Sequence, residues 1–191
     1  SWAAPAGTMQ EVRQLLAASA AERPSAKLLG LIDRTEGAGD YDTLFGHAQR
    51  PGGADGGRFD DVRVSQMTLG ELKAFAGVGP GMSAYGRHVY GELAQSGQEP
   101  REATPMGRYQ IVGTTLARLQ GEMGLSDDTV FSPRVQDAMA LRLIDQRLGA
   151  ATTMEGKIAG LREEWEGFQG VQAGALASAI REYESGQGRA A

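Results

Sequence analysis

The sequence contains no cysteine, and this absence removes several kinds of chemistry at once. Disulfide bonds, thiolate metal sites and cysteine nucleophiles all require a thiol side chain. Histidine is almost as scarce, because His47 and His88 are the only two in the 191 residues. The sequence therefore offers few histidines for a histidine-rich metal site or a Ser-His-Asp triad. It implies neither a metal nor any other cofactor.

Long apolar segments and an excess of positive charge are missing as well. No apolar run approaches the roughly 20 residues that a helix needs to cross a bilayer, so we expect no membrane span. The 24 acidic residues outnumber the 19 basic ones, the net charge is −5, and lysine and arginine form no cluster. Proteins that bind nucleic acid irrespective of sequence use a basic face, so the composition argues against this class.

What the chain does contain is an ordinary globular composition, with 41% hydrophobic and 23% charged residues. Its length is sufficient for one domain with its own core. We expect a flexible arm over residues 1–7, a single domain over 8–185 and a tail over 186–191. The sequence begins at Ser1 rather than Met, which fits an exported, processed protein and a shortened chain equally well.

Helical patterns cover most of the chain. Apolar spacing and capping residues predict helices near 8–21, 25–36, 69–76, 83–95, 114–124, 133–149 and 171–184. Thr68 with Glu71 forms a capping box, Thr114 is a candidate cap, and Ser132-Pro133 is a specific helix start. The segment "RFDDVRVS", residues 58–65, is the best strand candidate. The pattern therefore predicts a mostly α protein with a small β patch.

Glu36 stands where an apolar helix runs into a glycine-rich loop, in "LLGLIDRTEGAGDYDTLFG". A carboxylate here faces the negative end of the helix dipole, and apolar neighbours such as Leu31 and Ile32 partly bury it. Both effects favour the protonated form, which can donate its proton to the leaving oxygen of a glycosidic bond. The alternative is a solvated glutamate at a frayed helix end, and position alone favours that alternative.

A second polar stretch is "TPMGRYQIVG". Gly107 lets the backbone approach a ligand closely, and Arg108, Tyr109 and Gln110 offer polar and aromatic groups that suit sugar hydroxyls and ring faces. The plainer interpretation is a tight turn that leads into a helix, with Tyr109 in the core. Tyr41 is a further candidate for sugar contact, and half-buried packing is its alternative role.

Four elements of the chain occur together in an order and spacing that match a known family. They are Glu36-Gly37, Tyr41-Asp42, Gly107 to Gln110, and Phe131-Ser132-Pro133 followed by Gln136-Asp137-Ala138. With them, residues 28–150 resemble the endolysins of the bacteriophage lambda type, which belong to the lysozyme-like superfamily. Gln136 and Asp137 lie among apolar neighbours, and we interpret both as structural.

The resemblance implies a lysozyme-like α+β fold, mostly α, in which a small β patch and a helical lobe flank a glycan-binding cleft. It also implies cleavage of the β-1,4 bond between N-acetylmuramic acid and N-acetylglucosamine in peptidoglycan, leaving a 1,6-anhydro-muramic end. By position, Glu36 would protonate the glycosidic oxygen and then deprotonate the muramic C6 hydroxyl. We expect the substrate-binding residues to be Tyr41, Asp42, Asp60, Arg108, Tyr109 and Gln110.

A second carboxylate in the site would change this mechanism. Asp40 and Asp42 follow Glu36 closely, and Asp60 and Asp61 lie in the predicted strand, where alternation turns one of them inward. An aspartate facing Glu36 across a cleft would permit hydrolysis by an activated water, and the sequence leaves this open.

Two segments depart from the family pattern. The glycine-rich insertion over residues 49–57 indicates a remodelled lip on the β side of the cleft. Near the C-terminus the family has a cleft tyrosine, whereas "EEWEGFQG" offers Trp165 or Phe168, either as its substitute or as core.

The sequence therefore predicts a peptidoglycan-cleaving enzyme, most simply a lytic transglycosylase with Glu36 as the sole acid and base. A hydrolytic muramidase on the same fold is one alternative. A non-catalytic glycan-binding component of an envelope-crossing machine is the other, because fold likeness alone does not establish catalysis. We expect a monomer that binds peptidoglycan glycan strands. It would act on the cell wall, in the periplasm or after delivery by a phage or particle.

Overall fold

The computed structural model describes residues 13, 24–36, 39–52, 55–78, 83–100 and 103–190. These residues are mostly helical. A helix over 24–35 comes first, and the later α-helices are α2 (Leu69–Ala76), α3 (Ala84–Gln95), α4 (Gly113–Met123), α5 (Pro133–Gly149), α6 (Met154–Glu164) and α7 (Ala173–Ala190). Short 3-10 turns lie between them: η1 (Phe45–His47), η2 (Asp55–Gly57), η3 (Val64–Gln66) and η4 (Glu166–Gly170). The helix predicted near 8–21 lies outside the described residues, apart from Arg13, which is helical.

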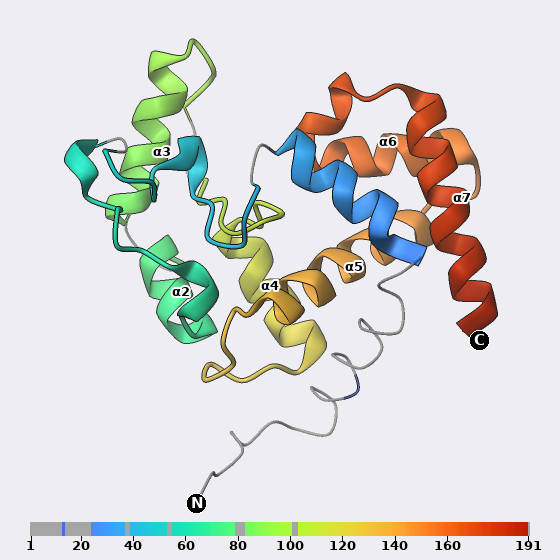
Figure 1. The fold of residues 1–191 in the computed structure, drawn as a ribbon, viewed down its shortest axis with the longest axis horizontal. Helices are drawn as coiled ribbons and strands as arrows, with labels where there is room; N and C mark the ends of the chain where they lie inside the picture. The colour runs from blue at the N-terminus through green and yellow to red at the C-terminus, as the bar shows by residue number, and fades with distance from the viewer. Residues whose placement is uncertain are drawn as a thin grey trace, which may run out of the picture.

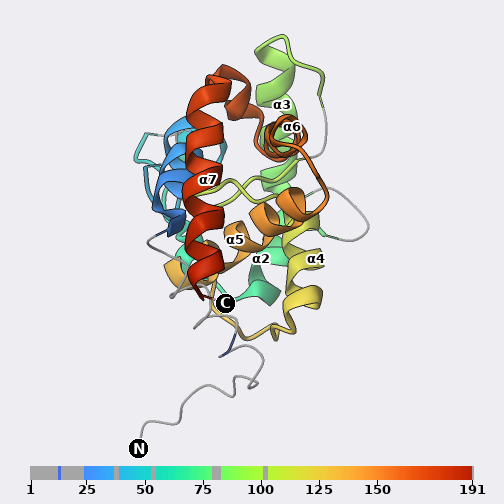
Figure 2. The ribbon, with the colours of Figure 1, turned by 90° about the vertical axis from the view of Figure 1, so that its right-hand side faces the viewer.

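The central element of the arrangement is α5. It contacts α4 and α6, while α2 contacts α3 and α4, and α6 contacts α7. Figure 1 shows α2 and α3 on one side of α5, with α6, α7 and the helix over 24–35 on the other. The helix over 24–35 lies beside α7 (Figure 2), and Lys27 Nζ donates to Ser178 Oγ at 2.9 Å. Two groups of helices are therefore connected through α5 and α4.

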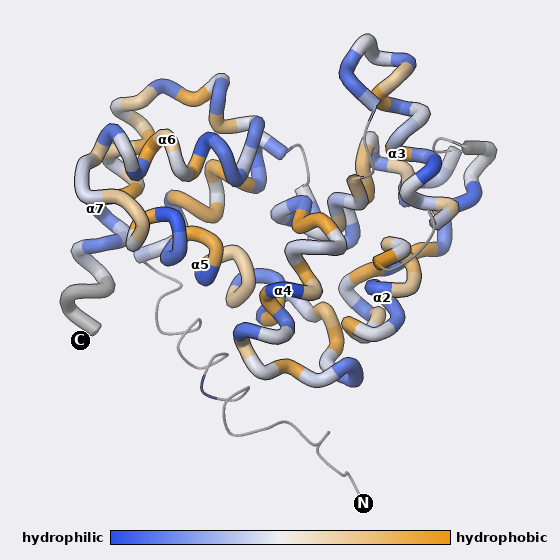
Figure 3. Tube along the Cα trace, turned by 180° about the vertical axis from the view of Figure 1, so that it is seen from behind, coloured by the Kyte–Doolittle hydropathy of each residue, from blue (hydrophilic) through white to orange (hydrophobic). Residues whose placement is uncertain are grey.

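The sequence of α5 explains why it occupies the middle. Ser132 Oγ accepts a hydrogen bond from the Val135 amide and Pro133 opens the helix, so the predicted start is confirmed. Nine of its 17 residues are buried, and Figure 3 shows hydrophobic residues along much of its length. A helix that is apolar on more than one face must be covered on more than one side.

The predicted starts of α2 and α3 are confirmed, whereas the predicted start of α4 is an exception. The capping box of Thr68 and Glu71 is present in full at the start of α2, and Ser83 caps α3. The exception is Thr114, because α4 begins at Gly113. The Gly113 amide is instead bound by Thr104 Oγ1 at 3.1 Å, a side chain from the preceding segment. The last helix also differs, because α7 continues to Ala190, beyond the predicted end at residue 184.

The predicted strand over residues 58–65 does not form. Phe59 and Val64 are buried, but they are five positions apart, a spacing that does not fit the period of two in a strand. The chain turns between them, because the Val62 amide bonds the Phe59 carbonyl at 3.0 Å. Arg63 Nη1 then binds the carbonyls of Asp60 and Val62 at 3.0 and 2.9 Å, which stabilises the turn.

The β structure of the described residues lies elsewhere and is limited to isolated antiparallel bridges. Met106 pairs with Leu44 and with Ile111, and Thr68 pairs with Val130. The turn from Met106 to Ile111 depends on Gly107, whose φ is +80°. A Cβ at Gly107 would also lie 2.3 Å from Oε1 of Gln136. The mostly helical prediction is therefore confirmed, and the β patch is smaller and differently placed than expected.

Candidate active site

A cavity of about 430 Å³ lies between the end of the helix over 24–35, η1, α3 and the junction of α6 with η4. Its polar side chains are Glu36, Thr43, His47, Gln110, Glu164 and Glu166. The apolar wall includes Leu44, Phe45, Val89, Leu93, Val112 and Trp165. A largely apolar cavity with a few polar groups is typical of a ligand site. Of the seven site residues predicted from the sequence, Glu36 and Gln110 line it.

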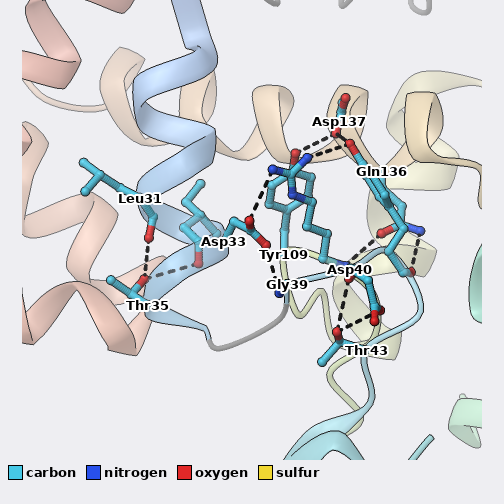
Figure 4. Close-up of polar contacts among 12 residues, drawn as sticks. Leu31, Asp33, Thr35, Gly39, Asp40, Thr43, Tyr109, Gln136 and Asp137 are labelled. Carbon is cyan, nitrogen blue, oxygen red and sulfur yellow. Dashed lines mark hydrogen bonds and ion pairs between the residues drawn. The ribbon is translucent and has the colours of Figure 1, made fainter. Parts of the chain in front are cut away.

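Glu36 follows the last turn of its helix directly. Its amide donates to the Ile32 carbonyl at 2.9 Å, and its side chain is half-buried. The neighbouring Thr35 hydroxyl turns back to its own helix, where it donates to the Leu31 carbonyl at 2.9 Å (Figure 4). The Glu36 carboxylate instead accepts a hydrogen bond from the Gly167 amide at 3.3 Å. The helix end and η4 are thus joined through the carboxyl group itself.

The surroundings of Glu36 raise the pKa of its carboxyl. Burial is the largest cause, because it disfavours the charged form, and the negative charge of Glu166 acts in the same direction. The hydrogen bond from the Gly167 amide opposes both, since it stabilises the carboxylate. The net effect is a carboxyl group that holds its proton to higher pH than an ordinary glutamate. Such a group can serve as a general acid.

Two further carboxylates line the cavity, and the sequence reasoning did not identify them. Glu164 ends α6 and its Oε1 lies 3.1 Å from Nε of Arg147, with which it forms an ion pair. Glu166 begins η4, is exposed, and its negative charge is one of the causes that raise the pKa of Glu36. Their signal in the sequence is the glutamates of "EEWEGFQG", the segment that also contains Trp165 and Phe168. Three carboxylates therefore share this cavity, and one of them is neutralised by an arginine.

Gln110 contributes to the opposite wall. It has a positive φ of 51°, an uncommon conformation for a residue other than glycine. Its Nε2 donates to the carbonyls of Thr43 and Gly107 at 3.1 and 2.9 Å, which fixes the side chain between the two segments. The amide of Gly107 in turn bonds the Thr43 carbonyl at 2.8 Å. The segments around residues 43 and 107 therefore form one wall.

His47 and Trp165 complete the lining. His47 has a φ of 57°, and its buried Nδ1 has no hydrogen-bond partner among the described residues. The Trp165 ring is almost fully buried, and its Nε1 donates to the Tyr109 carbonyl at 3.1 Å. Phe168, the other aromatic residue considered for the cleft, is fully buried. Trp165 is thus both a core residue and part of the cavity wall.

Tyr41, Arg108 and Tyr109 form a separate polar cluster with Asp33 and Asp137, part of which Figure 4 shows. Both tyrosine hydroxyls donate to Oδ1 of Asp137, at 3.0 and 2.6 Å. Burial and the Asp137 charge raise the pKa of Tyr109, so this hydroxyl keeps its proton. Arg108 contacts Asp33 at 3.2 Å and lies over both rings, 5.1 and 5.6 Å from their centroids. The cluster ties the helix over 24–35 to α5, and none of its members lines the cavity.

The predicted aspartates also lie outside the cavity lining. Asp42 Oδ1 accepts the Ser65 amide at 2.9 Å, and Asp40 Oδ1 accepts the Asp42 amide at 2.8 Å. Asp60 lies in the turn after η2, where its buried Oδ1 has no hydrogen-bond partner among the described residues. Asp61 is exposed. The structure therefore brings no predicted aspartate to the cavity that contains Glu36.

The part of the chain that the structure describes holds no group of three or more histidine, aspartate or glutamate side chains arranged to bind a metal ion. It also contains no helix long and apolar enough to cross a membrane.

Comparison with protein families matches residues 73–185 to a family model described as Endolysin. This match covers more than half of the chain and includes α3 to α6, Gln110 and the segment from Glu164 to Gly167. It begins after Glu36, which therefore lies outside the matched residues. Curated proteins and solved structures give no match.

Proposed function

The chain belongs to the endolysin family, and from this premise we propose that it cleaves peptidoglycan glycan strands as a lytic transglycosylase with Glu36 as its acid and base. Membership implies degradation of peptidoglycan and action on the cell wall. The bond that we propose is the β-1,4 link between N-acetylmuramic acid and N-acetylglucosamine. The observation that carries the proposal is the half-buried Glu36 carboxyl, with its raised pKa, on the wall of a cavity of about 430 Å³.

The chemistry requires one proton to be given and one to be taken. Protonated Glu36 donates to the glycosidic oxygen as the bond to C1 of the muramic residue breaks, and the N-acetylglucosamine leaves as an alcohol. The Glu36 carboxylate then accepts the proton of the C6 hydroxyl, whose oxygen closes onto C1. The carboxyl is again protonated, no water is consumed, and the product is a 1,6-anhydro end.

We propose a lysozyme-like arrangement in which the two groups of helices flank the cavity and the glycan runs between them. Gln110 and the Thr43 segment would contact sugar hydroxyl or acetamido groups, and Trp165 with its apolar neighbours would pack against a ring face. Tyr41, Arg108 and Tyr109 would support the site from behind, because their cluster fixes the helix that ends at Glu36.

Hydrolysis is the second candidate, and Glu166 is the observation that favours it. A carboxylate in the same cavity as the acid can activate a water, as in two-carboxylate glycosidases. Asp42 and Asp60, the partners that the sequence offered, lie outside the cavity lining. The two mechanisms differ in their products, because hydrolysis adds one water and transglycosylation adds none.

The test is mass spectrometry of the muropeptides released from purified peptidoglycan. Wild type, Glu36→Gln and Glu163→Gln would be compared, because Glu163 is exposed and outside the cavity, so its variant controls for charge. We expect anhydro-muramic products from wild type and from the control, and none from Glu36→Gln. Reducing ends heavier by one water would establish hydrolysis instead. Glycan binding without release by wild type would leave only a binding protein.

A further inference from the structure

Two of the described residues other than glycine have a positive φ, and both line the cavity that contains Glu36. They are His47, with a φ of 57°, and Gln110, with a φ of 51°. This conformation is strained for a residue that has a Cβ, and such strain is found disproportionately at active sites and ligand-binding sites. The strained backbone therefore directs attention to what these two side chains present to the cavity.

The turn that carries His47 is anchored by hydrogen bonds. Side chains hold the first two amides, since the Leu44 amide donates to Gln49 Oε1 at 2.9 Å and the Phe45 amide donates to the Tyr85 hydroxyl at 2.8 Å. The His47 amide then donates to the Leu44 carbonyl at 2.9 Å. These contacts hold His47 in its left-handed conformation on the cavity wall.

The two ring nitrogens of His47 differ in their surroundings. Nδ1 is buried and has no hydrogen-bond partner among the described residues. Nε2 also has no partner among the described residues but is not buried, so it is the nitrogen open to the cavity. A neutral imidazole carries its proton on one nitrogen, and an unpaired buried N–H is rarer in proteins than an unpaired buried acceptor. We therefore expect the proton on Nε2, where it forms a donor that faces the cavity.

Gln110 offers a complementary acceptor on the same wall. Its Nε2 is occupied by the carbonyls of Thr43 and Gly107, whereas its Oε1 has no partner among the described residues. Thr43 is followed by Leu44, whose carbonyl accepts the His47 amide, so both side chains are attached to adjacent residues of one segment. The wall therefore combines one donor and one acceptor.

We propose that His47 is a substrate-binding residue that recognises the acetamido group of an N-acetylated sugar, donating from Nε2 to the acetamido carbonyl oxygen. That group has a carbonyl acceptor, an N–H donor and a methyl group. His47 supplies the donor for the carbonyl, Gln110 Oε1 the acceptor for the N–H, and apolar lining residues such as Leu44 and Val89 a surface for the methyl. A sugar hydroxyl has no methyl and would use only part of this wall. The inference rests on the proposed function, because it takes the cavity of Glu36 as the glycan site.

The first measurement is ¹H–¹⁵N NMR of the histidine side chains in Glu36→Gln, a variant that we expect not to cleave glycan. The probes are tetra-N-acetylchitotetraose and cellotetraose, two β-1,4-linked chains that carry an acetamido group and a hydroxyl group at C2, respectively. We expect free His47 to carry its proton on Nε2, and its Nε2 resonance to shift with the N-acetylated probe only. His88 is the internal control, because it is the other histidine of the chain and does not line this cavity.

The second measurement is the affinity for both probes by calorimetry, in the same Glu36→Gln background, with His47→Gly, His47→Asn or Arg50→Ala added. Glycine and asparagine both tolerate a positive φ, so these two variants remove the imidazole without straining the turn. Arg50 is the control, because it follows His47 closely, is exposed and lies outside the cavity lining.

We expect His47→Gly to weaken binding of the N-acetylated probe about three- to tenfold, the effect of losing one hydrogen bond between uncharged groups. Binding of cellotetraose should change less than about twofold. His47→Asn should lose affinity in the same selective way, and Arg50→Ala should leave both affinities unchanged. With Glu36 intact, His47→Gly should raise the KM for soluble glycan strands several-fold and keep kcat within about twofold, since the contact is made equally before and during the reaction.

Three results would each overturn the inference: a proton on Nδ1 of free His47, no response of His47 to the N-acetylated probe, or equal loss of affinity for both probes in His47→Gly. Failure of wild type to release muropeptides would instead contradict the proposed function. Selective binding that depends on His47 would still support the acetamido site in that case, because the binding measurements need no turnover.

Discussion

Gln136 provides the sharpest test of how the site is held together. Its side chain is fully buried in α5 and makes three hydrogen bonds. Nε2 donates to the carbonyls of Tyr41 and Phe131, both at 3.0 Å, and Oε1 accepts the Arg108 amide, also at 3.0 Å. One side chain therefore fastens two separate segments, around residues 41 and 108, to the central helix.

Replacing Gln136 with leucine keeps the approximate volume and the helix propensity but removes all three hydrogen bonds. A buried group left without its partner costs about 1–3 kcal/mol, and two of the three bonds are only partly buried. After allowing for the gain from a more apolar side chain, we expect a loss of about 2–5 kcal/mol. Domains of this size have total stabilities of about 5–15 kcal/mol, so the loss would be large. The melting temperature would fall by roughly 5–20 °C.

The assay is urea unfolding followed by circular dichroism, with thermal unfolding in parallel. Gln146→Leu is the matched control, because this glutamine is on the same helix but bonds Glu122 and Arg118 at the surface. We expect it to change stability by less than about 0.5 kcal/mol. If Gln136→Leu also lost less than about 1 kcal/mol, the three bonds would not be what fastens these segments, and the reasoning would be wrong.

Two other predictions concern the junction at Glu36. Burial raises the folded-state pKa of the Glu36 carboxyl above its ordinary value of 4.5. The stability that the protonated carboxyl contributes is therefore fully present below the unfolded-state pKa, and it is lost as pH rises through the folded-state pKa. Glu36→Gln should therefore melt at a higher temperature than wild type at pH 7, and this advantage should disappear at about pH 4. An equal difference in melting temperature at both pH values would contradict the prediction. Gly167→Ala should lose about 1–3 kcal/mol in urea unfolding, because its Cβ would meet backbone atoms of the neighbouring helix. Gly170→Ala, whose Cβ would meet nothing within 4 Å, is the control, and equal losses in the two variants would refute the steric argument.

The features that sequence analysis predicted well depend on neighbouring residues. The capping box of Thr68 with Glu71 and the serine–proline start of α5 involve groups three residues apart or fewer, so their physics is visible in the sequence. The position of Glu36 at a helix end was predictable for the same reason. The cap of α4 was not, because the Gly113 amide is bound by Thr104, which lies outside the helix.

The features that the sequence did not predict depend on contacts between distant segments. Val62 and Val64 have strand propensity, but burial of Phe59 and Val64 and the turn between them override it. Sugar contact by Tyr41 and Tyr109 stays a prediction, but the sequence did not reveal that both hydroxyls are directed to Asp137 in α5. Composition and spacing contain no information about which backbone amide meets the Glu36 carboxylate across the fold. That partner is set by how α6 and η4 fold back onto the first part of the chain.

The long sequence separation between Glu36 and Gly167 also determines when the site exists during synthesis. Glu36 is synthesised before the opposite wall, from Glu164 to Gly167, because 131 positions separate it from Gly167. A chain that stops before residue 164 retains Glu36 and lacks the groups that shelter and tune it. Incomplete copies of the chain therefore cannot assemble the cavity that contains Glu36.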